Sequence, residues 1–549
     1  MIDPPPARLA PSPLGARVAV ALLLVASLLA TWRAGSPGAA ADDAADPYAA
    51  VLPARRAAVA ARTDGRLSRY TFDVALDPAA SAIGGTAEVV FRNNADVPLA
   101  EAWFRLFPNA AYYGDGGTAV RDVTVDGAAA TPTFALDGTA MRVPFAAPLA
   151  PGATATIRFG FTTTVPTDSA GSFGILSHAT GPGTWVLSDW HPVLAVWEAG
   201  SGWSLPAPTE AGDPTYAEAA LYDVTIQAPD SLRLVLPGAV VEDVAADGIR
   251  RQRAVAGPAR DFTLVADDDY VTDERTVDGT TITLHANPGR DPAVRQGILD
   301  AAAAALAFDN ATLGPYPFAR LEIADVPLEA SLGVSWTGLV FLDGPGMLGR
   351  AVTADSETVV AHEVSHEWWG ATVGADTNTH PFMAEGLATI SALLTQERTA
   401  GPDVAGQQFD RWVVGPTAAL LRAGDVAVDR PAAPGDDQDA RAWAAYGKAS
   451  LAFTAIREEI GDDAFLAGLR GFAERWQFGI AGPADLRAAW EQASGRDLGE
   501  LWAHWFDRAE LTQAELEAVA AAYPGKAPSG PGPGGTPQPG AAMPSRPAS

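Results

Sequence analysis

One short pattern restricts this chain more than any other: a His-Glu-x-x-His sequence formed by His362, Glu363 and His366. Helix-start signals ahead of it predict a helix over residues 353 to 369, and two histidines four positions apart on a helix lie on one face, one turn from each other. A lone histidine is usually an ordinary core residue. However, the chain has only 7 histidines, and the pattern is expected by chance about 0.005 times in such a chain. The sequence therefore predicts a metal site.

The neighbouring residues indicate which metal it binds. Glu363 lies about 100° around the predicted helix from His362, so its carboxylate can act as general base on a metal-bound water without binding the metal. Catalytic Zn²⁺ takes three protein ligands and keeps one position open. The expected third ligand is Glu385, which eighteen residues (367–384) separate from His366; the alternative is that Glu385 is an ordinary surface carboxylate. A metzincin site is excluded, because Trp369 and Thr372 stand where that class has a glycine and a third histidine.

These residues and their spacing resemble the gluzincin zinc metallopeptidases of the aminopeptidase-N family. The shared features are the His-Glu-x-x-His pattern, the Trp-Trp-Gly that ends at Gly370, and Glu385-Gly386 at the family spacing. Further along, Ala445-Tyr446-Gly447-Lys448 is similar to the family's Tyr-x-Lys segment. The resemblance implies one Zn²⁺ per chain, a peptide or protein substrate, and a tyrosine, Tyr446, that stabilises the oxyanion formed during hydrolysis.

The resemblance also implies a multidomain fold. An N-terminal antiparallel β-sheet domain of saddle-like shape is followed by an α+β, thermolysin-like catalytic domain that ends in helices. The sequence pattern agrees, because short alternating runs are typical of antiparallel strands from Tyr70 onward, and helical periodicity prevails after Tyr446. The predicted units are a loose lead-in (42–64), the β-sheet domain (65–272), the catalytic domain (273–523) and a disordered Pro/Gly-rich tail (524–549).

Two local expectations follow from this division. The second metal-binding helix is predicted to begin at Pro381, with Glu385 about one turn inside it. Because no residues remain for the further C-terminal domains that family members often carry, the chain is expected to be a short form.

Composition narrows the partners and the compartment. A formal net charge of −29 argues against nucleic acid and anionic membrane surfaces as partners, and the absence of cysteine excludes disulfides and thiolate chemistry. Residues 1–41 contain an apolar run shorter than the ~20 residues of a spanning helix. They therefore predict a cleaved signal peptide, with an uncleaved anchor at residues 18–32 as the alternative. The protein is expected to be secreted or extracytoplasmic, with membrane contact only through that segment.

One segment departs from the family pattern. Aminopeptidases of this family carry a Gly-x-Met-Glu-Asn segment whose glutamate binds the free amino terminus of the substrate. Here Gly333, Val334 and Ser335 occupy that segment, with Ser335 at the glutamate position. A neutral hydroxyl cannot replace a charge-assisted contact with the amino terminus. Glu322 and Glu329 are the candidates to supply the missing negative charge, and Glu329 is the preferred one.

The predicted function is zinc-dependent hydrolysis of peptide bonds, with aminopeptidase-like specificity. The alternatives are an endopeptidase or another zinc hydrolase, or a non-catalytic binding protein that retains the fold.

Overall fold

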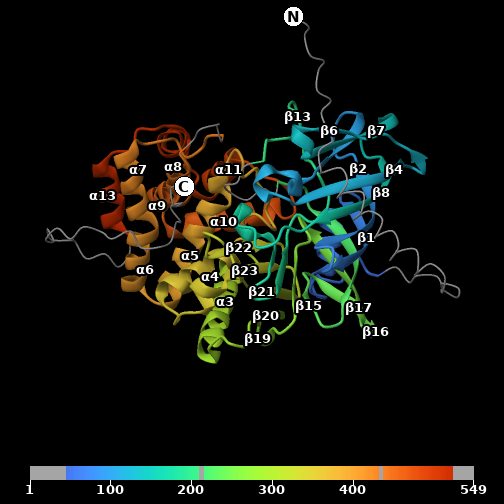
Figure 1. Cartoon of the computed structure of the whole chain (residues 1–549). Helices are drawn as coiled ribbons and strands as arrows, with labels where there is room; N and C mark the ends of the chain where they lie inside the picture. Colours follow the sequence, from blue (N-terminus) through green and yellow to red (C-terminus); the bar gives the residue numbers. More distant parts are fainter. Residues whose placement is uncertain (1–44, 209–215, 432–436, 524–549) are drawn as a thin grey trace, which may run out of the picture.

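A computed structural model of the chain describes residues 45–208, 216–431 and 437–523. The predicted signal peptide or anchor (1–41) and the predicted disordered tail (524–549) lie outside the described residues. In Figure 1 the strands of residues 68–267 lie on the right and helices α4 to α13 lie on the left. The predicted order, a β-sheet domain followed by an α+β domain that ends in helices, is confirmed.

The β-sheet domain is built around an eight-stranded sheet of order β16-β17-β14-β1-β2-β8-β4-β5. Alternate residues of β1, among them Tyr70, Phe72 and Val74, are buried, as expected for a strand with one face on the core. The strands of this sheet are β1 (Ser68–Asp77), β2 (Ala82–Arg92), β4 (Gly117–Val125), β5 (Ala128–Ala129), β8 (Thr154–Thr164), β14 (Ala220–Pro229), β16 (Ala239–Ala246) and β17 (Ile249–Ala259).

The prediction of a purely antiparallel sheet is wrong at one pair, because β1 and β14 run parallel. The long connection between these two strands, residues 78–219, makes the parallel pair feasible. The domain also contains three smaller sheets. Their strands are β3 (Leu99–Arg105), β6 (Thr133–Ala135), β7 (Ala140–Leu149) and β11 (Val193–Leu194); β9 (Leu176–Ala179), β10 (Thr184–Leu187), β15 (Arg233–Val235) and β18 (Leu264–Asp267); and β12 (Trp197–Glu198) with β13 (Gly202–Trp203).

The catalytic domain combines a five-stranded mixed sheet, of order β19-β20-β21-β23-β22, with helices. The predicted boundary at residues 272/273 falls inside β19, the first strand of this sheet. The strands are β19 (Val271–Val277), β20 (Thr280–Ala286), β21 (Arg320–Val326), β22 (Gly333–Trp336) and β23 (Leu339–Asp343). The helices are α3 (Pro292–Thr312), α4 (Ala354–Ser365), α5 (Glu385–Thr399), α6 (Pro402–Phe409), α7 (Gly415–Ala423), α8 (Gln438–Ala442), α9 (Ala449–Ile460), α10 (Asp462–Trp476), α11 (Pro483–Ser494), α12 (Gly499–Trp502) and α13 (Gln513–Ala522).

The prediction of a loose lead-in at 42–64 is wrong for its described part. Val51 is fully buried and forms a β-bridge with Phe318, and helix α2 (Arg56–Thr63) packs Val59 into the catalytic core. The Ala/Asp-rich composition is that of a linker, but a few apolar side chains suffice to anchor the segment.

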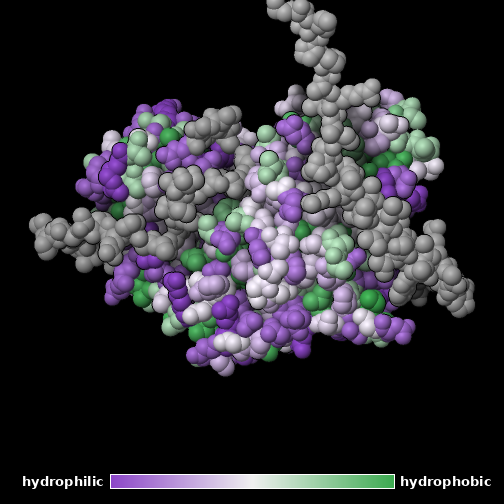
Figure 2. Space-filling model, viewed as in Figure 1, coloured by the Kyte–Doolittle hydropathy of each residue, from purple (hydrophilic) through white to green (hydrophobic). Residues whose placement is uncertain are grey.

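The surface shows no extended apolar region on the face drawn in Figure 2, where polar and apolar side chains are interspersed. None of the described helices is both long and apolar enough to cross a membrane.

Candidate metal centre and active site

Helix α4 presents the two histidines. Its first turn is closed by a reciprocal cap, because the Thr353 hydroxyl accepts from the Ser356 amide and the Ser356 hydroxyl accepts from the Thr353 amide. The helix ends at Ser365, earlier than the predicted residue 369, but His366 keeps helical backbone angles (φ −61°, ψ −20°). His362 and His366 therefore remain one turn apart on one face.

Helix α5 presents Glu385 from its first residue. The predicted start at Pro381 is wrong, because a short 3-10 turn (Pro381–Met383) precedes the helix. Glu385 thus stands at the positive end of the helix dipole, which favours its charged form. Gly386 allows close packing there, since a Cβ at this position would lie 3.0 Å from the Ala445 carbonyl oxygen.

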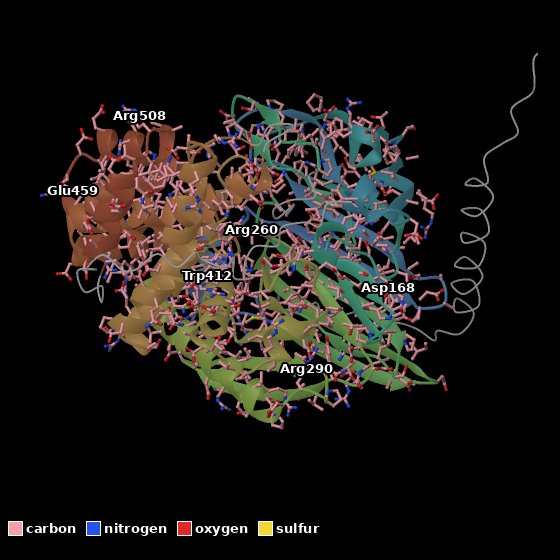
Figure 3. The ribbon with its side chains drawn as sticks, turned by 60° about the vertical axis from the view of Figure 1, so that its left-hand side comes forward. Asp168, Arg260, Arg290, Trp412, Glu459 and Arg508 are labelled. Carbon is pink, nitrogen blue, oxygen red and sulfur yellow. The ribbon has the colours of Figure 1, made fainter. Side chains whose placement is uncertain are left out.

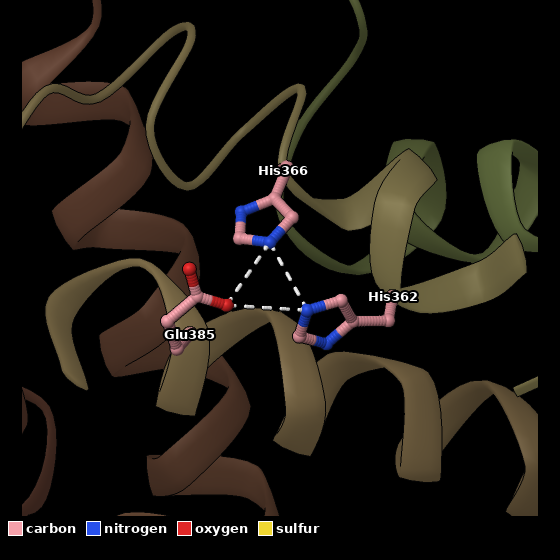
Figure 4. A group of neighbouring side chains, drawn as sticks. All are labelled: His362, His366 and Glu385. Atoms are coloured by element: carbon pink, nitrogen blue, oxygen red, sulfur yellow. Dashed lines mark hydrogen bonds and ion pairs between the residues drawn. The ribbon is translucent and has the colours of Figure 1, made fainter. Parts of the chain in front are cut away.

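Three side-chain atoms from these two helices converge (Figure 4). The Nε2 atoms of His362 and His366 lie 3.1 Å apart. Oε2 of Glu385 lies 3.3 Å from the first and 3.4 Å from the second. Among the described residues the structure brings together the three side chains that the sequence predicted as metal ligands.

The geometry of these atoms fits a tetrahedral zinc ion. Ligand atoms at about 2.0–2.1 Å from Zn²⁺ stand about 3.3 Å from one another, which matches the three separations. Glu385 Oε2 is buried and makes no hydrogen bond, although both imidazole nitrogens lie close to it. Three electron-pair donors that point at one place, with a buried oxygen left unsatisfied, are what a cation requires.

The protein groups alone set up strong electrostatic coupling at this site. Burial lowers the pKa of the His362 imidazole. Burial would also lower the pKa of His366, but the Glu385 and Glu363 carboxylates and the Trp369 carbonyl together outweigh burial and raise this pKa to about 9. Burial opposes ionisation of Glu385, yet the two histidines hold its pKa well below the usual range. Glu385 is therefore ionised, as a metal ligand must be.

Further contacts, which the sequence analysis missed, orient the two imidazoles. His366 Nδ1 lies 2.9 Å from the Trp369 carbonyl oxygen, and His362 Nδ1 lies 3.3 Å from the Thr389 hydroxyl. Such partners fix the ring orientation of metal-binding histidines. Thr389 follows Glu385 by one helical turn, so the i, i+4 spacing could have indicated it. No sequence signal singles out a carbonyl.

Glu363 lies against the edge strand of the catalytic sheet. Its carboxyl group is buried, and burial raises its pKa to about 8. Gly333 packs on it so closely that an added Cβ would lie 2.5 Å from Glu363 Oε1. Because side chains two apart on a strand share a face, Ser335 is on the same side of β22 as this contact, and Val334 on the other side. The Ser335 Oγ atom is buried without a hydrogen-bond partner among the described residues.

Tyr446 is placed beside the histidines by a π-helical turn, Trp443–Lys448. Its ring is stacked on His362 with 5.7 Å between centroids, and the Trp412 ring lies 6.4 Å from the same imidazole. Lys448, two residues later, is fully buried and donates to both carboxylate oxygens of Asp425. Its role is therefore structural.

Glu322 and Glu329, the two candidates to bind the amino terminus of the substrate, differ in their surroundings. Glu322 is buried and bound to His285 (2.8 Å) and Arg320 (2.6 Å), so it is not free to reach a substrate. Glu329 is exposed, and its backbone amide donates to the Phe173 carbonyl oxygen. Among the described residues, the Glu329 carboxylate makes no hydrogen bond or ion pair with the residues of the site.

Comparison with known proteins finds a matching family model and several similar aminopeptidases. The family model for the peptidase family M1 domain matches residues 299–505. Aminopeptidase M1-A of Oryza sativa subsp. japonica is 25% identical over 298 residues, which cover 52% of this chain and 34% of that protein. The chain thus matches about a third of the length of the curated relatives.

Solved structures match over more of the chain. An M1 zinc metallopeptidase from Deinococcus radiodurans aligns with a TM-score of 0.61 at 17% identity, covering 81% of this chain and 94% of that one. A mutant of an M1 zinc metallopeptidase from the same organism, bound to a Tyr-Ser-Ala substrate, aligns with a TM-score of 0.60 at 16% identity, covering 81% and 95%. At this identity the likeness shows the two-domain fold.

Proposed function

We propose that the chain is a zinc-dependent aminopeptidase of the M1 peptidase family, whose domain model matches residues 299–505, and that it takes peptides as substrates. One Zn²⁺ per chain would be held by His362, His366 and Glu385. The observation that carries the proposal is the convergence of these three donors at separations of 3.1–3.4 Å, beside a buried glutamate that is not one of them.

The protein's own groups suit hydrolysis. Zn²⁺, when bound, supplies a Lewis acid that polarises the scissile carbonyl and makes a water more acidic. Glu363 takes the proton from the attacking water and delivers it to the leaving amine nitrogen. A carboxyl group whose burial raises its pKa to about 8 is suited to hold that proton between the two steps. The Tyr446 hydroxyl donates to the carbonyl oxygen as negative charge develops on it.

Strand β22 supplies the wall for the substrate. Among the described residues it is the edge strand of its sheet and pairs with β23 alone. Its outer backbone groups can therefore pair with an extended peptide, and Gly333, Val334 and Ser335 would bind that peptide next to Glu363. The Tyr-Ser-Ala substrate bound to the Deinococcus radiodurans enzyme supports a short peptide as the ligand.

A second candidate function is cleavage that does not require a free amino terminus. It is favoured by Ser335, whose hydroxyl is neutral, and by the engagement of Glu322 with His285 and Arg320. In the aminopeptidase proposal Glu329 carries the amine contact. Comparing a fluorogenic tripeptide with its N-acetylated form separates the two functions. Loss of cleavage on acetylation supports the aminopeptidase, and equal rates support the second candidate.

The test of the catalytic proposal is Glu363→Gln. We expect kcat to fall by at least about 100-fold with zinc content unchanged, because the amide cannot accept the proton. Glu357→Gln, the same change in the first turn of α4, is the matched control and should keep wild-type activity. Wild-type protein that holds zinc but turns over no peptide in a broad library would support a non-catalytic binding protein instead.

Export to an extracytoplasmic compartment is part of the proposal. It is supported by the apolar run within residues 18–32 of the sequence. Mass spectrometry of the mature protein tests whether the segment is cleaved: a new N-terminus near residue 41 supports a cleaved signal peptide, and an intact Met1 contradicts cleavage and favours the uncleaved anchor.

A further inference from the structure

A buried arginine of the β-sheet domain reaches into the catalytic domain. Arg260 directly follows β17 and is 5% exposed. Figure 3 shows it near the centre of the molecule, between the strands and the helices. Its guanidinium donates to the carbonyl oxygens of Ala217 (Nη1, 2.8 Å), Ala371 (Nε, 2.8 Å), and Thr372 and Gly479 (Nη2, 3.3 and 2.5 Å). Three of these four acceptors belong to the catalytic domain.

Two of the acceptors lie in the turn that follows the metal-site helix. The Ala371 amide donates to the His366 carbonyl oxygen (3.1 Å), and the Gly370 amide donates to the Val373 carbonyl oxygen (2.9 Å). The same turn carries the Trp369 carbonyl oxygen, 2.9 Å from His366 Nδ1. Hydrogen bonds therefore connect the Arg260 guanidinium to the backbone of this turn, and the Trp369 carbonyl oxygen of the same turn contacts the imidazole of His366.

The guanidinium also fits its place closely. A Cβ at Gly374 would lie 2.3 Å from Arg260 Cζ, so only glycine leaves room for the guanidinium there. Gly374 itself is bound to the segment that follows α10. Its amide donates to the Gly479 carbonyl oxygen (3.0 Å), and its carbonyl oxygen accepts from the Ala481 amide (2.8 Å). Arg260 is therefore enclosed by backbone on several sides, where its rigid fork of donors is well matched to fixed acceptors.

The next residue fixes the opposite wall of the site. Asp261 Oδ2 accepts from the Thr337 amide (3.1 Å) and the Thr337 hydroxyl (2.9 Å), at the turn between β22 and β23. The following Gly338 amide donates to Glu367 (3.0 Å). The Arg260–Asp261 pair thus ties the β-sheet domain to both the His366 turn and the strand that packs on Glu363.

We propose that Arg260 is a positioning residue: it holds the turn whose carbonyl orients the His366 imidazole, and through it the β-sheet domain sets the metal affinity of the catalytic domain. This inference rests on the proposed role of His366 as a metal ligand. Loss of a partner that orients a metal-binding histidine typically weakens metal binding 10–100-fold.

The experiment compares Arg260→Gln and Arg260→Lys with Arg457→Gln, in the full chain and without substrate. Arg457 is the matched control: it is also buried (8% exposed) and bound to Glu397 and Asp462. Glu397 lies about 18 Å along α5 from Glu385. Zn²⁺ affinity is measured by competition with a chelator, ligand geometry by the absorption spectrum of the Co²⁺-loaded protein, and stability by urea unfolding.

We expect Arg260→Gln to weaken Zn²⁺ affinity by about 10–100-fold and to alter the Co²⁺ spectrum. Arg260→Lys should weaken it less, because an ammonium still reaches some of the four carbonyls, although fewer than the guanidinium does. Arg457→Gln should lower stability while leaving affinity within about threefold of wild type. If Arg260→Gln does not fold, Arg260→Lys decides by the same measurements.

Wild-type affinity and spectrum in the folded Arg260 variants would overturn the inference, as would an equal loss of affinity in Arg457→Gln. A wild-type protein that binds Zn²⁺ but cleaves no peptide would instead contradict the proposed function, and this inference would stand.

Discussion

Replacing Gly333 with alanine tests how tightly the position of Glu363 controls the reaction. The added Cβ would lie 2.5 Å from Glu363 Oε1 and 2.6 Å from its Cγ. Non-bonded atoms settle at about 3.5 Å or more, so the carboxylate must move by about 1 Å. A 1 Å misplacement can cost about 100-fold in rate, equivalent to about 2.7 kcal/mol in the barrier. The fold should be retained, because the atoms that the added Cβ displaces belong to the Glu363 side chain and not to the backbone.

The assay is kcat/KM on a chromogenic aminoacyl substrate, together with zinc content. We expect about a 100-fold fall in kcat/KM with zinc retained, because His362, His366 and Glu385 are untouched. Gly471→Ala in α10 is the control, since nothing lies within 4 Å of the Cβ it adds. It should keep full activity and gain up to about 1 kcal/mol of stability. A folded, zinc-loaded Gly333→Ala with wild-type kcat/KM would refute the reasoning.

Three further predictions follow from the same contacts. Tyr446→Phe should lower kcat by about 100-fold or more through loss of the oxyanion donor, and steady-state kinetics showing unchanged kcat would remove Tyr446 from the mechanism. Because His366 in the metal-free protein has a pKa raised to about 9, Zn²⁺ must displace its proton at lower pH, so affinity should rise about tenfold per pH unit up to pH 9. Calorimetry at pH 7 in buffers of different ionisation enthalpy should then show release of about one proton, and no release would contradict this. Asp425→Ala leaves the buried Lys448 ammonium unpaired and should lower the free energy of unfolding by about 3–5 kcal/mol; a loss below about 1 kcal/mol in urea unfolding would show that water reaches Lys448.

The parts of the site that depend on local spacing could be predicted from the sequence. His362 and His366 lie together because four residues make one helical turn, and the spacing to Glu385 sufficed to bring it to the same point. The alternating pattern around Tyr70 likewise predicted a strand with one buried face, which β1 confirms.

Features that depend on contacts between distant segments could not be predicted. Arg260 binds carbonyl oxygens 43 to 219 residues away, and any residue type can supply a carbonyl, so the sequence carries no signal for it. The buried Val51 was missed because the composition around it is that of a linker. The late start of α5 was missed because a proline at a first helical position fits a 3-10 turn as well as an α-helix.

The most direct test of the metal centre is anomalous diffraction at the zinc edge from crystals of protein loaded with one equivalent of Zn²⁺. We expect one strong peak at about 2.0–2.2 Å from each of His362 Nε2, His366 Nε2 and Glu385 Oε2. A peak elsewhere, or one that contacts the imidazoles but leaves Glu385 out, would contradict it.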